Sequence, residues 1–119
     1  MVHSLFLIGL SFFTVHEMDA VRCKEWRIFP GLSLLSNKTG QLVFILTHIL
    51  LFYLVFYQMI YNSDHGGFIK GFEIFLVVHV GLHLLFLIHK KNAFMDWISW
   101  MLIIGAGLFG LADLLIHSL

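Results

Sequence analysis

The sequence predicts an all-α fold, a bundle of four transmembrane helices that forms a single domain over residues 1–119. Sixty per cent of the 119 residues are hydrophobic and only 12% are charged, whereas a soluble domain is about half apolar and about a quarter charged. Four apolar stretches, separated by short polar turns, are each long enough to cross the ~30 Å hydrocarbon core of a bilayer as a helix. We expect these helices at about residues 2–24, 41–61, 68–89 and 94–118.

The first expected helix carries ionisable side chains where it should still lie in hydrocarbon. Residues 2–15 are almost wholly apolar, and His16, Glu17 and Asp19 then follow without any turn signal. At about 1.5 Å per residue, His16 lies roughly 10 Å short of the far membrane surface. Ionisable groups at that depth are costly, so they usually have a partner or a functional role.

The second and third expected helices also carry histidines among apolar residues. A linker at residues 31–40, rich in turn-forming residues, leads to the second helix and its His48. A short polar turn at residues 62–67 leads to the third helix, which carries His79 and His83. Residues four apart lie on one face of a helix, and this is the spacing at which two imidazoles bind one metal ion.

The fourth expected helix has no metal-binding side chain at the depth of these histidines. Ala106 and Gly110 form a face of small residues that favours close helix packing. Asp113 and His117 share that face nearer the other membrane surface, where Glu73 of the third helix also lies. We interpret these three polar residues as a polar seam near the surface, and their role stays open.

The distribution of basic residues predicts how the bundle is oriented in the membrane, and the net charge indicates which class of partner is absent. Six of the seven basic side chains fall at the end of the bundle that holds the linker and the turn at residues 90–92. The positive-inside rule predicts that this end is cytoplasmic. Both termini should therefore lie outside. The net charge is zero and no basic run is present, which argues against a nucleic-acid partner. The six basic residues at that end are Arg22, Lys24, Arg27, Lys38, Lys90 and Lys91.

Depth along the membrane predicts a metal site in the cytoplasmic half of the bilayer. His16, His48 and His83 each lie roughly 10 Å from the cytoplasmic surface, and His79 lies one turn deeper. A zinc or iron ion needs three or more nitrogen or oxygen ligands from different elements. We expect all four imidazoles to share one coordination sphere, with a nearby carboxylate binding the ion, orienting an imidazole or acting as a catalytic base. The carboxylate candidates are Glu17 and Asp19.

Several functions fit such a site. The first is a metalloenzyme that acts on a membrane-embedded small molecule, by hydrolysis at zinc or oxidation at iron. The second is an electron carrier with haem b held by His48 and His83, with Gly81 allowing close approach of the porphyrin. The third is an accessory subunit of a larger membrane complex, or a homo-oligomer. A structural polar network or a proton pathway would also use these residues.

The pattern of polar residues resembles a family of small bacterial four-helix membrane proteins that is known only as a domain of unknown function. The resemblance covers nearly the whole chain and rests on a His-Glu-x-Asp-Ala motif, a following Glu-Trp-Arg, and the histidines of the second and third helices. It implies a bacterial inner-membrane protein and brings no activity. The matching positions are His16, Glu17, Asp19, Ala20, Glu25, Trp26, Arg27, His48, His79 and His83.

Overall fold

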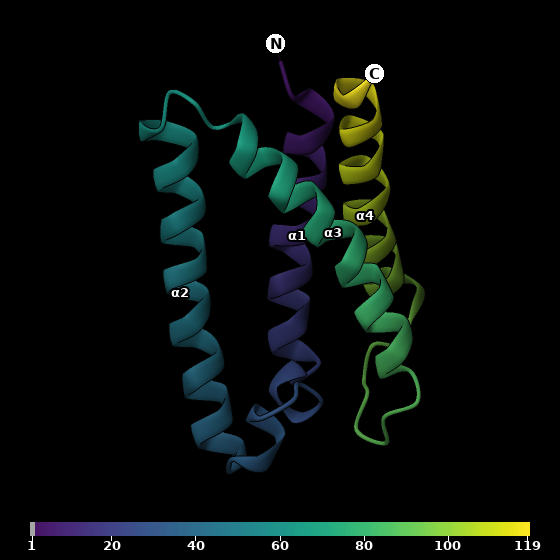
Figure 1. Ribbon diagram of the computed structural model, residues 1–119. Helices are drawn as coiled ribbons and strands as arrows, with labels where there is room; N and C mark the ends of the chain where they lie inside the picture. Colours follow the sequence, from purple (N-terminus) through teal and green to yellow (C-terminus); the bar gives the residue numbers. More distant parts are fainter. Residues whose placement is uncertain (1) are drawn as a thin grey trace.

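The computed structural model describes residues 2–119, and within that range it contains four long helices and no strand (Figure 1). All four helices are long and apolar enough to span a membrane, which confirms the predicted all-α class and indicates an integral membrane protein. Both chain ends lie at the same end of the bundle (Figure 1). The helices are α1 (Ser4–Arg22), α2 (Asn37–Tyr61), α3 (Gly66–Phe86) and α4 (Trp97–Ser118), with short 3₁₀ helices η1 (Glu25–Arg27) and η2 (Leu32–Leu34).

The largest difference from the expected boundaries is at the start of α2, which begins at Asn37 rather than near residue 41. The Ser36 side chain caps this helix by accepting a hydrogen bond from the Thr39 backbone N–H at 3.2 Å. The same serine, asparagine and threonine residues that form turns also form helix N-caps, so the pattern alone favoured a longer linker.

Three of the helices form the packed core, and small residues allow their close approach. At Gly9 of α1, a Cβ atom would lie 3.1 Å from both the Ala106 carbonyl oxygen and the Gly110 nitrogen of α4. At Gly110, a Cβ atom would lie 3.2 Å from the Cβ of Leu76 in α3. The small-residue face expected on the fourth helix is therefore the surface where α4 meets both α1 and α3.

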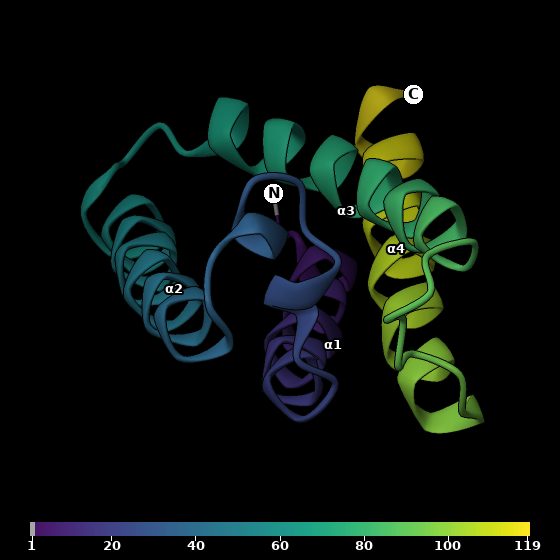
Figure 2. The same cartoon turned by 90° about the horizontal axis from the view of Figure 1, so that it is seen from below.

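The second helix stands apart from this core (Figure 2). It reaches the other helices through long side chains such as Phe52, whose ring centroid lies 6.4 Å from that of Phe13 in α1. Most of its apolar side chains are exposed, which suits a helix surrounded by lipid. Between α2 and the core lies a cavity of about 570 Å³.

The chain turns back on itself directly after α1, and this turn shapes the site. Lys24 has a left-handed backbone conformation with φ 52° and ψ 54°, so η1 folds back towards the bundle and buries Glu25 and Trp26. The Trp26 indole donates a hydrogen bond to the Asn37 side chain at 2.8 Å, and its ring packs on Gly40. These contacts fix η1 against the start of α2.

Candidate metal centre

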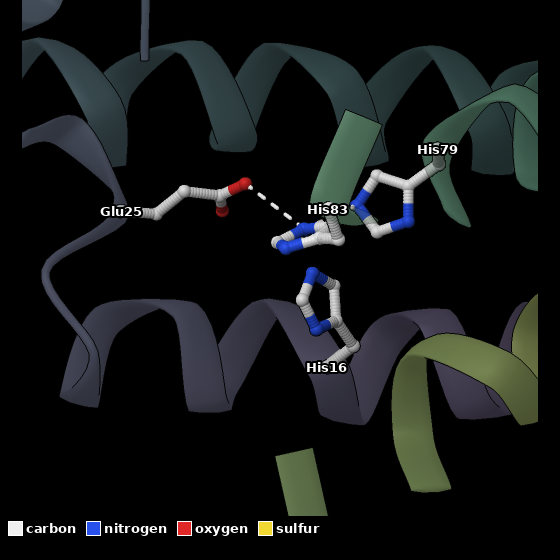
Figure 3. A group of neighbouring side chains, drawn as sticks. All are labelled: His16, Glu25, His79 and His83. Atoms are coloured by element: carbon white, nitrogen blue, oxygen red, sulfur yellow. Dashed lines mark hydrogen bonds and ion pairs between the residues drawn. The ribbon is translucent and has the colours of Figure 1, made fainter. Parts of the chain in front are cut away.

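Three buried histidines meet at the centre of the cytoplasmic half expected from the sequence. His16 comes from α1, and His79 and His83 come from successive turns of α3 (Figure 3). The three ring centroids are 4.5 to 4.8 Å apart in every pair, and the rings meet edge to face. The structure thus brings together three of the four histidines that the sequence predicted to share one coordination sphere.

Glu25 of η1 is the fourth member of this group (Figure 3). Its Oε1 atom lies 3.4 Å from His83 Nε2, which in turn lies 3.2 Å from His79 Nε2. With metal–ligand bonds of about 2.0–2.1 Å, the ligand atoms of a tetrahedral site are about 3.3 Å apart. One potential ligand atom from each of the four residues lies within 4.8 Å of the others, so small side-chain adjustments suffice to hold one ion.

The unsatisfied polar atoms of the group also fit an ion. Neither ring nitrogen of His16 has a hydrogen-bond partner among the described residues, although this side chain is fully buried. An unpaired buried polar group costs about 1–3 kcal/mol. A neutral imidazole satisfies this requirement by binding a metal ion, and histidine with glutamate is a common donor set for zinc and iron. The residues present therefore fit a transition-metal ion.

Aromatic side chains enclose the group and limit access of water. The ring of Phe94 lies 4.6 Å from that of His83 and 5.5 Å from that of His16. The ring of Phe13 packs 5.4 Å from that of His79 on the opposite side. An apolar wall of this kind lowers the local dielectric and strengthens electrostatic interactions inside the site.

His48 lies beside this group rather than within it. Its Nε2 atom is ion-paired with Glu17 Oε2, and the other Glu17 oxygen lies 3.8 Å from His16 Nε2. The ring of His48 is also tied to its own helix, because its Nδ1 lies 2.6 Å from the Phe44 carbonyl oxygen. The structure thus groups three histidines with Glu25 and leaves His48 beside that group, since α2 stands apart from the core.

Asp19 faces the opposite way, towards α4. Its Oδ2 accepts a hydrogen bond from Ser99 Oγ at 2.5 Å, and its Oδ1 accepts one from Arg22 Nε at 2.7 Å. Arg22 also pairs with Asp96 at the start of α4, at 3.2 Å. The structure places Asp19 in a polar contact between α1 and α4, apart from the three histidines.

The haem alternative needs an open face in front of each axial nitrogen. His83 Nε2 instead faces His79 and Glu25, and both ring nitrogens of His48 already have partners. Gly81, expected to approach the porphyrin, has no atom within 4 Å of a Cβ built on it and lies on an exposed surface. The arrangement favours a bare ion over a porphyrin.

Sequence reasoning missed Glu25 as a site residue. A helix that continues past residue 24 would carry Glu25 out of the bilayer, so helical periodicity does not group it with the histidines. Its burial requires the left-handed turn at Lys24, and lysine gives no signal for that conformation. The one available signal was its place in the Glu-Trp-Arg motif of the family that the sequence resembles.

Fold and site together define a small four-helix integral membrane protein with a buried histidine–glutamate group. No curated protein and no solved structure matches the chain. The family described as "Family of unknown function (DUF6713)" matches residues 2–119, and the chain belongs to this family.

Proposed function

We propose that this chain is a membrane metalloprotein, and specifically a metalloenzyme that acts on a small apolar molecule dissolved in the bilayer. Four buried side chains that meet within 4.8 Å and fit one zinc or iron ion are the observation that carries the proposal. The basic residues near η1 support a cytoplasmic position for this end, in a bacterial inner membrane. The four residues are His16, Glu25, His79 and His83.

The cavity beside α2 supports the choice of substrate class. Its volume of about 570 Å³ lies within the range typical of small-molecule sites. Its wall is mostly apolar, and the polar side chains that line it are Glu17, Glu25, Thr47, His48 and His79, so two members of the buried group border it. Because the cavity opens beside a helix whose outer face is apolar, lipid-soluble molecules are the natural entrants.

The Glu17–His48 pair supplies a proton next to the buried group. His48 Nδ1 must carry a proton, because it contacts a carbonyl oxygen that only accepts hydrogen bonds. The contact between His48 Nε2 and the Glu17 carboxylate is favourable only if a second proton lies between them. This proton borders the cavity, where the pair is placed to act as a general acid or base.

The buried residues would hold the ion and exclude water from it. A bound zinc or iron ion would supply Lewis-acid or redox chemistry at the inner wall of the cavity. Glu17 Oε1 lies 3.8 Å from His16 Nε2, beyond hydrogen-bond distance, and a small movement of either side chain would let this carboxylate orient that imidazole. The sequence predicted Glu17 and Asp19 as catalytic candidates. Glu17 stays a candidate through its pair with His48, whereas both oxygens of Asp19 are engaged in the contact with Arg22 and α4.

Metal analysis of the purified, tag-free protein in detergent tests the metal site. We expect about one equivalent of zinc or iron in the wild type and its loss in His83→Ala. The matched control is His89→Ala, because His89 is an exposed histidine outside the group. Equal metal content in folded His83→Ala and wild-type protein would refute the metal site, and an intense Soret band would support haem instead.

Photolabelling tests the substrate class. A diazirine-bearing alkyl probe in a reconstituted bilayer should label peptides from the cavity wall, including those of Leu51 and Leu82. Thr47→Trp should reduce this labelling, because Thr47 lines the cavity and the larger indole would fill it. Equal labelling in the two proteins would show that the probe meets only the outer surface, which contradicts a substrate cavity.

A further inference from the structure

A second polar group lies at the opposite end of the bundle, where the two chain termini meet. His3 precedes α1, Asp113 and His117 lie near the end of α4, and Glu73 lies in α3. We propose that these four residues form a second transition-metal site, independent of the buried group near η1, with zinc as the best-matched ion. Its ligands would come from three separate parts of the chain.

The carboxylate of Asp113 is the centre of this group. Its Oδ2 atom lies 2.6 Å from His3 Nδ1 and 3.1 Å from His117 Nδ1. His117 Nδ1 also lies 2.9 Å from the Asp113 carbonyl oxygen, which only accepts hydrogen bonds, so His117 would bind an ion through its other ring nitrogen, Nε2. The two imidazole rings are stacked, with centroids 4.0 Å apart. Ligand atoms from all three residues lie within 4.8 Å of one another, which matches the two-histidine, one-carboxylate donor sets of zinc and iron sites.

Glu73 gives an independent indication of a cation. Its side chain is 2% exposed, and its Oε1 atom has no hydrogen-bond partner among the described residues. This oxygen points into the group, 4.0 Å from His3 Nδ1. Two buried carboxylates need compensating positive charge, and the nearby Lys70 forms no ion pair with either carboxylate in residues 2–119. Protonation of the two imidazoles or a divalent cation supplies that charge, and only a cation also gives Glu73 Oε1 a partner.

The second group is also reachable from water. A cavity of about 520 Å³ lies against it, lined by His3, Lys70, Glu73 and His117 and by residues at the start of α3 and the end of α4. By the positive-inside argument this end faces the outside of the cell. An ion can therefore enter from the aqueous phase, whereas the group near η1 is walled by aromatic rings.

Sequence reasoning reached three of these residues but not the fourth. Asp113, His117 and Glu73 were interpreted as a polar seam near the membrane surface. His3 stands at the very start of the helix expected at residues 2–24 and 110 residues from Asp113, so nothing local in the sequence pairs the two. Its addition changes the donor set from one imidazole to two. Ion binding would also join the ends of α1, α3 and α4.

Zinc titration of the tag-free protein in detergent tests this proposal. The probe is zinc chloride alone, and bound metal is measured after dialysis. We expect two equivalents in the wild type, with one lost in His3→Ala and the other retained. His83→Ala should show the reverse, losing the inner equivalent only. His65→Ala is the matched control, because His65 lies at the same end of the bundle but outside the group, and it should bind as the wild type does.

Cobalt substitution gives a second readout that does not depend on stoichiometry. Cobalt at the proposed site should give visible absorption bands that disappear in His3→Ala and in Asp113→Asn. The His3 side chain makes no capping hydrogen bond to α1, so its replacement should not disturb the start of that helix. Zinc binding and cobalt spectra that are unchanged in His3→Ala and Asp113→Asn would overturn the proposal. A single equivalent lost in His3→Ala but kept in His83→Ala would support this site and refute the one near η1.

Discussion

Adding one methyl group at Gly9 tests how the core is packed. The Cβ of Gly9→Ala would lie 3.1 Å from the Ala106 carbonyl oxygen and from the Gly110 nitrogen, and 3.3 Å from the Phe109 Cβ. Two of these neighbours are backbone atoms of α4, which cannot rotate away as a side chain can. The helices must separate by a few tenths of an ångström, and overpacking of this kind costs about 1–3 kcal/mol.

The same substitution at Gly81 is the matched control. Gly81 is also inside a helix, but no atom lies within 4 Å of a Cβ built there. Glycine costs about 1 kcal/mol relative to alanine in a helix interior, so Gly81→Ala should be neutral or slightly stabilising. At Gly9 the same gain offsets part of the overpacking, which leaves a net loss of up to about 2 kcal/mol.

Reversible unfolding in mixed detergent micelles, followed by circular dichroism, measures both changes in the free energy of unfolding. We expect Gly9→Ala to unfold at lower denaturant concentration than the wild type, and Gly81→Ala at the same or higher concentration. If Gly9→Ala is as stable as Gly81→Ala, then α1 and α4 are not in backbone contact at this position, and the proposed packing of the core is wrong.

Three further predictions concern orientation, the site and pH. In intact cells, Asp64→Cys should react with an impermeant maleimide and Lys91→Cys should not, because the positive-inside rule predicts that the basic end faces the cytoplasm; the reverse pattern would invert the predicted topology. The single native cysteine is buried, which raises the pKa of its thiol and keeps it unreactive. Glu17→Gln should weaken metal binding about 10–100-fold, whereas Asp19→Asn should lower the Tm without changing metal affinity; equal metal affinities would remove Glu17 from the site. The Asp96 carboxyl accepts a hydrogen bond from a backbone N–H of the first turn of α4, which lowers its pKa. Because its pKa is lowered in the folded protein, the ionised Asp96 carboxyl stabilises the fold above about pH 4, and this stabilisation is lost on acidification. The Tm difference between wild type and Asp96→Ala should therefore narrow towards pH ~3. A Tm difference that does not change with pH would contradict this.

The fold could be predicted because its signals are local in the sequence. Apolar stretches of membrane-spanning length, separated by short turns, leave few alternatives to a helical bundle. The pairing of His79 and His83 was equally readable, since residues four apart on a helix always share a face. Boundaries were harder to predict, because Ser36 and its neighbours suit a turn and an N-cap alike.

The composition of the site depended on information that the sequence does not carry locally. Counting residues along a helix gives the depth of His48 in the membrane, and that depth agreed with His16. Depth is only one of three coordinates, however, and the lateral distance between helices follows from side-chain packing. The position of Glu25 depended on the left-handed backbone conformation of Lys24. For a lysine, this conformation costs about 1 kcal/mol or more relative to its ordinary conformations.

The main alternative to a metal site is a purely structural polar network. Two polar side chains of α1, His16 and Asp19, distinguish between these two interpretations. Asp19 has a hydrogen-bond donor at each oxygen, as a group that only joins two helices should. His16, three residues earlier, is fully buried and has no hydrogen-bond partner at either nitrogen within residues 2–119. Selection for stability alone would favour an apolar side chain there over an unsatisfied imidazole. The contrast on one helix therefore favours a bound ligand for His16 and a structural role for Asp19.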